Sequence, residues 1–453
     1  MSRANASSAG LGRARVFLFL ATGLAIPLFA FPPIRVLGKP VDAATIFAAA
    51  FAAASAAALA TRLAGRLGPV VAILAGLAPL AVLLPPRPPN FSLSAFASSE
   101  AHWVLVVLFF VTALTLRPDP DSARSIVLAH LAAGCAVAAF ALYQLVGNPR
   151  GWPGTGTVLF SPLQREPFRF TPVGSTYLGG GYMRPTSIFL EPAWMGGYLA
   201  WIVALAALWP AGRRGLAPAL RIAAAALSTA AIAASVSWGA YADLLVVLAV
   251  ATVSLGARRA TGRGFALGVA AALLLGALAL ATPPGRRVLG AVAERLELLK
   301  STAVGKDSAV ADTPRVRMLN AAHAWRLFVE NAPKGVGLGQ FRRYAWNVPE
   351  GGQGDFGESM SRRDPWFGWI TVAAEAGVLG PLVLAAAVAI VALRARGRAA
   401  ALAAALCALA VVQQVHTGSY IDLWWWFPLS LAAVLAAAGG DGAALAPGPG
   451  GVR

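Results

Sequence analysis

Long apolar segments separated by short connections dominate this sequence. A helix needs roughly 20 mostly apolar residues to cross the hydrocarbon core of a bilayer. Of the 453 residues, 58% are hydrophobic and only 12% are charged, which is too apolar for a soluble protein of this length. The sequence therefore predicts an all-α polytopic membrane protein with about 12 transmembrane helices. The twelve segments are 14–33, 42–61, 67–84, 101–116, 125–147, 187–209, 216–235, 239–257, 264–282, 366–393, 399–415 and 420–439.

The basic residues predict the orientation of these segments. If the N-terminus is cytoplasmic, 17 Lys and Arg residues lie at inner ends, and the short outer loops hold only Arg35, Lys39 and Arg87. The other 17 lie in two long loops, where the positive-inside rule does not count. This asymmetry predicts N-in, C-in topology with both long loops outside. The predicted regions are 1–147 with helices 1–5, loop 148–185, 186–282 with helices 6–9, loop 283–365, 366–439 with helices 10–12, and a disordered cytoplasmic tail at 440–453.

Charge and cysteine usage exclude several classes of site. The net charge is +18, but most charges separate apolar segments, which argues against a nucleic-acid partner. The two cysteines, Cys135 and Cys407, both lie inside apolar segments, so neither a disulfide framework nor a metal cluster is indicated. Because the histidines form no cluster either, we expect no metal and no cofactor.

The larger loop, 283–365, holds 13 Lys/Arg and 9 Asp/Glu. Its central part predicts a helix over roughly 315–330, on which Arg317, Asn320 and Ala324 share one face and His323 lies beside it. Glycines 335, 337 and 339 follow this helix. They lack the preceding strand and the lysine-serine pair of phosphate-binding loops, so the series predicts a tight turn.

The smaller loop leads into the sixth segment through Arg184 and Glu191. If this stretch is helical, seven residues make two turns, which puts both side chains on one face about 10 Å apart. A carboxylate at membrane depth is costly and usually faces a cavity. The alternative interpretation is an ion pair that closes a helix end.

Two other outer junctions carry polar side chains. One precedes Asp243, and the other contains His416 and Asp422, for which we favour a structural role over a catalytic one. The tryptophans 424–426 predict an interfacial aromatic belt.

The order of these features resembles the O-antigen ligase and O-antigen polymerase superfamily. The resemblance covers 184–380 and rests on the Arg184 segment, on Arg317…Trp325…Pro333-Lys334-Gly335-Val336-Gly337-Leu338-Gly339, and on Glu375-Ala376-Gly377. Two positions depart from the family pattern: Trp366 replaces the histidine of ligases, and Trp238 replaces an arginine. The Glu191-Pro192 pair looks closer to polymerases than to ligases.

The resemblance implies glycosyl transfer from an undecaprenyl-diphosphate-linked glycan at the periplasmic face of the bacterial inner membrane. The acceptor would be another lipid-linked repeat unit for a polymerase, or lipid A-core for a ligase. Membrane lipids and a chain-length regulator are further candidate partners. A transporter of lipid-linked glycans is the competing reading from a different class.

Such a transfer requires fixed cations at the departing diphosphate and a base at the acceptor hydroxyl. We expect Arg184 and Arg317 to bind the diphosphate, with Arg315 as a reserve. Glu191 and Asp364 are equal candidates for the base, followed by His323.

Overall fold

The computed structural model describes most of the apolar segments and part of the larger loop. The described residues are 3–28, 34–36, 39–63, 93–153, 155, 177–178, 182–189, 191–209, 217–256, 286, 290, 312–341, 367–395, 399–416 and 422–440. The predicted segments 67–84 and 264–282, the candidate base Asp364, the position Trp366 and the tail from 441 lie outside them.

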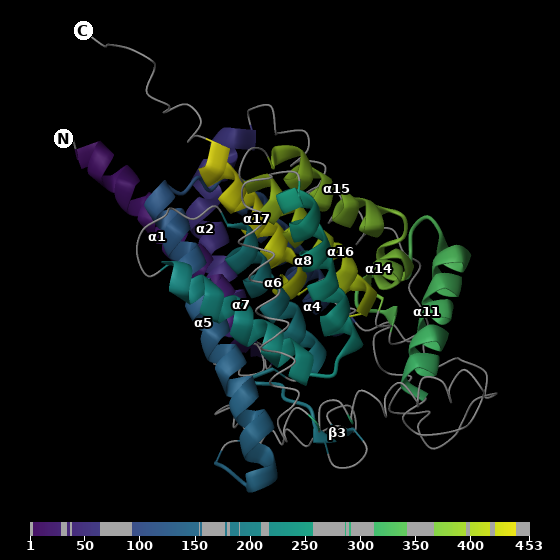
Figure 1. Cartoon of the computed structure of the whole chain (residues 1–453). Coiled ribbons are helices and arrows are strands. Elements are labelled where there is room, and N and C mark those ends of the chain that lie inside the picture. The colour runs from purple at the N-terminus through teal and green to yellow at the C-terminus, as the bar shows by residue number, and fades with distance from the viewer. Residues whose placement is uncertain are drawn as a thin grey trace.

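Within the described residues the chain forms twelve α-helices and two short antiparallel hairpins (Figure 1). The helices are α1 (Arg3–Ala25), α2 (Ala43–Leu63), α4 (Leu93–Ala113), α5 (Pro120–Gly147), α6 (Pro192–Leu208), α7 (Ala217–Ala234), α8 (Trp238–Gly256), α11 (Asp312–Asn331), α14 (Gly368–Ala376), α15 (Leu379–Arg394), α16 (Ala400–His416) and α17 (Leu423–Gly440). The hairpins pair β1 (Ile34–Val36) with β2 (Lys39–Val41) and β3 (Tyr177–Leu178) with β4 (Tyr182–Met183).

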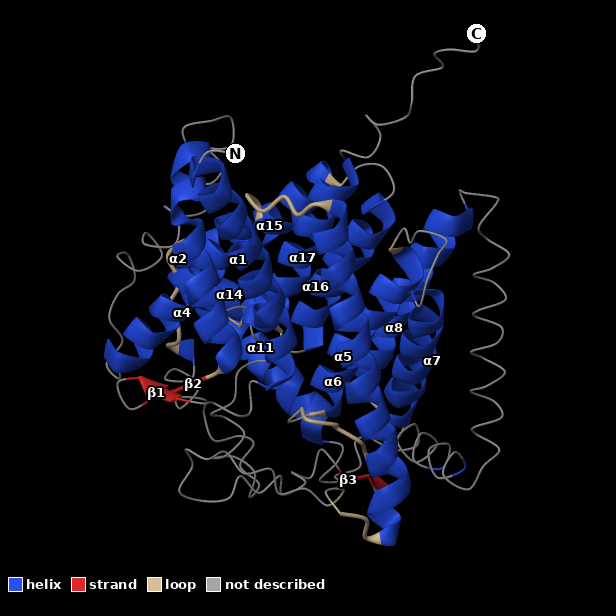
Figure 2. Cartoon of the chain, turned by 90° about the vertical axis from the view of Figure 1, so that its left-hand side faces the viewer, coloured by secondary structure: helices blue, strands red, loops and turns tan. Residues whose placement is uncertain are grey.

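The apolar helices stand side by side in one bundle (Figures 1 and 2). Contacts join α6 to α7, α8 and α16, and they join α17 to α4, α15 and α16. Helix α6 is the most enclosed of these, because 14 of its 17 residues are buried. A helix that is apolar all round must be covered by other helices or by lipid, and in this bundle other helices cover most of α6.

Three described helical stretches are long and apolar enough to cross a membrane: Leu11–Leu28, Phe96–Ala113 and Pro120–Arg150. Their mean hydropathies are 1.5, 1.6 and 2.1. Seven shorter apolar helices accompany them, as expected for a helical membrane protein. The number of spans and their orientation remain sequence-based predictions.

Two predicted segments differ from the helices observed. Helix α4 begins at Leu93 rather than 101, so it is a full 21-residue helix and not a short one. The predicted segment 366–393 is two helices, α14 and α15, because the chain breaks at Gly377 (φ 61°, ψ −150°). That backbone conformation is open to glycine and costly for other residues. The helix predicted over 315–330 is confirmed as α11.

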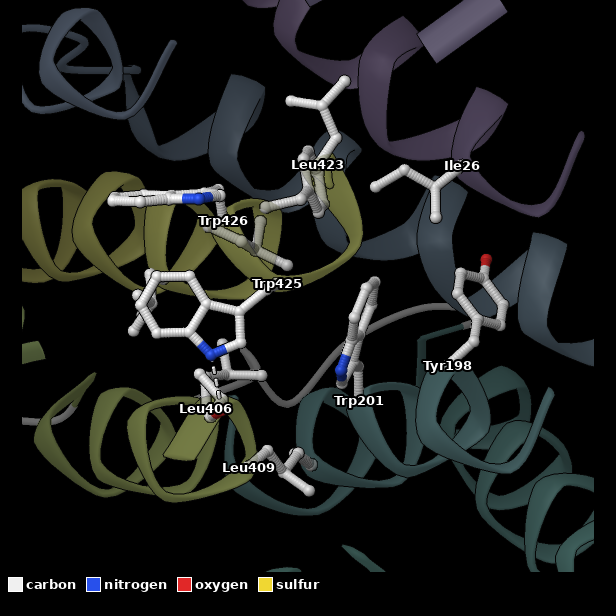
Figure 3. Packing of buried hydrophobic residues seen from close by; sticks show 14 of the residues in the cluster. Ile26, Tyr198, Trp201, Leu406, Leu409, Leu423, Trp425 and Trp426 are labelled. Atoms are coloured by element: carbon white, nitrogen blue, oxygen red, sulfur yellow. Dashed lines mark hydrogen bonds between the residues drawn. The ribbon is translucent and has the colours of Figure 1, made fainter. Parts of the chain in front are cut away.

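The prediction of an interfacial aromatic belt is wrong for Trp425 and Trp426. Both side chains are fully buried, turned into the bundle between α17 and its neighbours (Figure 3). The Trp425 Nε1–H donates to the Ala410 carbonyl oxygen at 2.6 Å, and Trp426 packs against Trp103. The reason is that α17 lies inside the bundle, so its aromatic face meets other helices.

Candidate functional site

Contacts between helix ends gather several candidate residues at one end of the bundle. We call this the mouth end: α6, α8 and α17 begin there, and α5 and α16 end there. Gln413 near the end of α16 donates to the Gly197 carbonyl oxygen in α6 at 3.2 Å, and a Cβ on Gly239 at the start of α8 would lie 2.5 Å from His416 Nδ1. All of these ends are the ones that the sequence predicts to face outside.

The segment 184–189 is fixed to α5 at the mouth end by Gln144. The Gln144 Oε1 accepts the N–H groups of Thr186 (3.1 Å) and Ser187 (2.7 Å), and its Nε2 donates to the Ser187 carbonyl oxygen (3.0 Å). Ser187 itself has a positive φ of 53° and donates from Oγ to the Val137 carbonyl oxygen. Arg184, at the start of this segment, is buried, with 6% of its surface exposed.

The predicted helical spacing of Arg184 and Glu191 is wrong. Helix α6 begins only at Pro192, and Glu191 is its N-cap residue in extended conformation (φ −135°, ψ 146°). Arg184 and Glu191 each precede a proline, and a residue before proline is driven away from helical conformation. Proline is in turn well suited to the first helical position, which explains where α6 starts. Glu191 therefore lies at the helix end, not two turns inside it.

The glycine series after α11 binds the carboxylate of Glu375. The backbone N–H of Gly339 donates to Glu375 Oε2 at 3.0 Å, and that of Phe341 donates to Oε1 at 2.8 Å. Gly335, Gly337 and Gly339 have φ values of 77°, 100° and 70°. The predicted tight turn is thus confirmed. Its glycines also turn the backbone so that its N–H groups hold a protein carboxylate.

The same loop fills the break between α14 and α15. The Val336 N–H donates to the Ala374 carbonyl oxygen (2.9 Å), and the Val378 N–H donates to the Pro333 carbonyl oxygen (3.0 Å). Cβ atoms on Gly335 or Gly377 would collide with the facing backbone. The two sequence motifs therefore interlock, backbone against backbone, and α11 packs beside α14 (Figure 1).

The remaining candidates on α11 are placed in less detail. Arg315 and Arg317 lie in the first turns of the helix, and the structure describes their backbone but not their side chains. His323 Nδ1 lies 3.1 Å from Arg326 Nη2, and its ring packs 5.7 Å from that of Phe341. A guanidinium donor at Nδ1 occupies that lone pair, which leaves His323 less suited to accept a proton there.

A buried polar cluster at the mouth end joins Asp243, which has no role assigned from the sequence, to His416, for which the sequence favours a structural one. Asp243 in α8 is fully buried, and its Oδ1 lies 3.0 Å from His416 Nε2 in α16. Gln413, also fully buried, donates to Asp243 Oδ2 at 3.3 Å. The signal in the sequence was an aspartate inside an apolar segment, since such residues usually face a partner in the bundle.

In the part of the chain that the structure describes, His, Cys, Asp and Glu side chains form no group of three that could hold a metal ion. The geometry offers a buried arginine, a helix-end carboxylate and an oriented histidine at one end of an apolar bundle. These groups can bind an anion and move a proton. Comparison of the sequence with protein-family models and with curated proteins gives no match.

Proposed function

We propose that this protein is a membrane glycosyltransferase of the polysaccharide-polymerase type. It transfers a glycan from an undecaprenyl-diphosphate carrier to a sugar hydroxyl of another lipid-linked repeat unit, without a metal ion or nucleotide. The reaction takes place at the mouth end, which faces the periplasm from the bacterial inner membrane.

The interlocking of two sequence motifs carries this proposal. The segment Pro333–Gly339 and the segment Glu375–Gly377 are the parts of the sequence that resemble O-antigen polymerases and ligases. They are about 40 residues apart in the chain, yet they are bonded to each other through the Glu375 carboxylate and three further backbone contacts. If the two short motifs resembled the family only by chance, there would be no reason for them to contact each other. Their contact therefore supports the resemblance.

The chemistry follows from the charges at the reacting groups. Negative charge develops on the diphosphate as it leaves, so fixed arginines lower the barrier when they point at that group. Arginine suits this role because its planar guanidinium binds phosphate oxygens in pairs and stays charged. Arg184 and Arg317 take this role in the proposal, and Arg315 supports them. Direct displacement by the acceptor hydroxyl inverts the anomeric carbon.

The broken helix at Gly377 is the feature that a transporter would also require. Transporters use unwound helix segments to coordinate substrates or ions near the middle of the membrane. Here the backbone around the break is bonded to the 333–337 loop instead, through the Pro333 carbonyl oxygen and the Gly337 N–H. This bonding favours a structural break over a transport site.

Complementation of a deletion strain tests the proposal. Arg184→Ala and Arg317→Ala are each expected to lower polymer formation by about 10²-fold or more, because a fixed charge at the leaving group is lost. Glu191→Gln and Asp364→Asn test the remaining carboxylates. Surface glycan is then separated on gels.

Loss of a polymerase leaves single repeats on the acceptor, whereas loss of a ligase leaves long chains on the lipid carrier. Arg124→Ala is the control, because Arg124 is exposed near the start of α5, at the opposite end of the bundle from the mouth end. Normal polymer in both arginine variants would exclude the assigned diphosphate site.

A further inference from the structure

Helix α11 exposes an apolar stripe beside a charged one. Trp325 and Val329 are 55% and 58% exposed, and Ala322 is exposed with them. Residues three and four positions apart lie on one face of a helix, so these three side chains form the apolar stripe. Arg326 and Glu330 form the neighbouring charged stripe, with side chains 54% and 57% exposed. An exposed apolar surface bordered by charge is typical of a contact with a partner or a membrane.

The opposite face of α11 is already used in packing. Ala324 and Leu327 are buried in a cluster with Ala374 of α14, and Ile370 packs against the same cluster. These contacts fix the rotation of α11 about its own axis. The apolar stripe therefore faces away from α14, and the helix cannot turn to hide it without exposing Leu327.

Contacts with α16 set the depth of α14 in the bundle. The Trp369 Nε1–H donates to the Val411 carbonyl oxygen at 3.2 Å, and a Cβ on Gly368 would collide with the Gln414 side chain. Both partners lie in the last two turns of α16, roughly 17–21 Å along the helix from its predicted inner end. In a hydrocarbon core about 30 Å thick, this level falls in the outer half. Figure 1 shows α11 beyond α14, at the outer edge of the bundle.

The exposed apolar surface of α15 leads toward the apolar stripe. Val378 is 41% exposed, and Leu382, one turn further along, is 53% exposed. Because α15 is one of the apolar helices of the bundle, we expect such side chains to face lipid. The Val378 N–H donates to the carbonyl oxygen of Pro333, which is exposed just after α11. The apolar surface thus continues from α15 across Pro333 toward α11.

We infer that the apolar stripe is inserted into the outer leaflet of the membrane, so that α11 anchors the larger loop to the bilayer. The partner is the phospholipid itself. Trp325 lies at the interface, where indole rings are favoured, and Val329 reaches the acyl chains. Arg326 and Glu330 point to headgroups and water, as in other amphipathic helices at a membrane surface. The anchor does not depend on the proposed glycosyl transfer. It also sets the height of Arg317, which lies about 12 Å before Trp325 along the same helix.

Two pairs of neighbouring positions test the anchor. Val329 is matched by Glu330 and Trp325 by Arg326, because the two members of each pair have nearly equal exposure on the protein. Val329→Cys, Glu330→Cys, Trp325→Cys and Arg326→Cys are made singly in the full-length protein and reconstituted in phospholipid liposomes. The rate of labelling by a charged, water-soluble maleimide is then measured. The unsubstituted protein gives the background from its own two cysteines.

The lipid should separate the members of each pair. A thiol reacts as the thiolate, which an apolar environment disfavours, and a charged reagent does not enter the acyl region. Labelling of Val329→Cys should therefore be at least about tenfold slower than that of Glu330→Cys, and Trp325→Cys should be slower than Arg326→Cys by a similar factor. All four variants should react equally once the protein is unfolded. Because these side chains lie on the surface, the substitutions should not disturb folding, and each pair gives its own answer.

Each outcome decides the inference. Slow labelling of Val329→Cys and Trp325→Cys that persists when the protein is diluted in pure phospholipid supports the anchor. Equal rates within both pairs would overturn it, because the stripe would then face water. Slow labelling that is seen in native membranes but lost in liposomes would also overturn it and assign the stripe to another protein. Protection that disappears on dilution in the lipid would assign the stripe to a second copy of the chain instead.

Discussion

Replacement of Glu375 by Gln should release the loop that joins the two motifs. The carboxylate accepts the N–H groups of Gly339 and Phe341 at 3.0 and 2.8 Å, and Glu375 is only 4% exposed. An amide keeps one acceptor oxygen and turns an NH₂ group toward the other backbone N–H. One charge-assisted hydrogen bond is lost, and a buried donor is left unsatisfied. Together these cost about 2–4 kcal/mol.

Hydrogen exchange measures this cost directly. Because about 1.4 kcal/mol corresponds to a tenfold change in an equilibrium constant, the amides of Gly339 and Phe341 should exchange about 30- to 700-fold faster in Glu375→Gln. The effect should be confined to 333–341 and to the facing turn at Gly377, since the bundle is held by separate contacts.

Glu330→Gln is the control, because Glu330 is 57% exposed and its ion pair among the described residues is with Arg326, at 3.6 Å. Such exposed pairs contribute little, so exchange in the loop should not change. Equal protection of Gly339 and Phe341 in Glu375→Gln and in wild type would refute the reasoning that the carboxylate holds this loop.

Two further predictions concern the mouth end and the start of α5. Gln144→Ala removes three hydrogen bonds to the segment 186–187, at a local cost of about 2–5 kcal/mol, so proteolysis of 182–189 should accelerate. Glu330→Ala, on the exposed surface of α11, should leave it unchanged. Asp119 caps α5, and bonds from the Ser122 hydroxyl and N–H lower its pKa. The cap therefore stabilises α5 fully at pH values above the ordinary pKa of an aspartate. Its contribution is lost as the pH falls through the lowered pKa of Asp119, so the Ser122 amide should lose protection from hydrogen exchange in acid. Asp119→Asn should make that protection independent of pH.

Periodicity and apolar length predicted most of the helices correctly. Segments such as those of α2, α7, α8 and α16 were located to within a few residues, because a long apolar run bounded by polar residues has few other stable forms. The break at Gly377 was missed because it depends on contacts with the loop that begins at Pro333. That loop lies about 40 residues earlier in the sequence. Apolar content alone does not distinguish one helix from two.

The candidate site was predicted only in part. The sequence pointed to Arg184 and Glu191, but two prolines cancel the helical spacing on which their pairing was based. His416 and Asp243 are 173 residues apart, and only the packing of α8 against α16 brings them together. A pairing over that distance leaves no periodic signal in a single sequence.

Formation of a glycosidic bond by the purified protein is the most direct test of the proposed function. Wild-type protein in liposomes is given the undecaprenyl-diphosphate-linked repeat unit, with a metal chelator and without nucleotide. We predict a ladder of products that grows by one repeat unit at a time, one lipid diphosphate released per bond, and loss of both signals in Arg184→Ala. Movement of the intact lipid-linked unit across the membrane without formation of a glycosidic bond would contradict the proposed function.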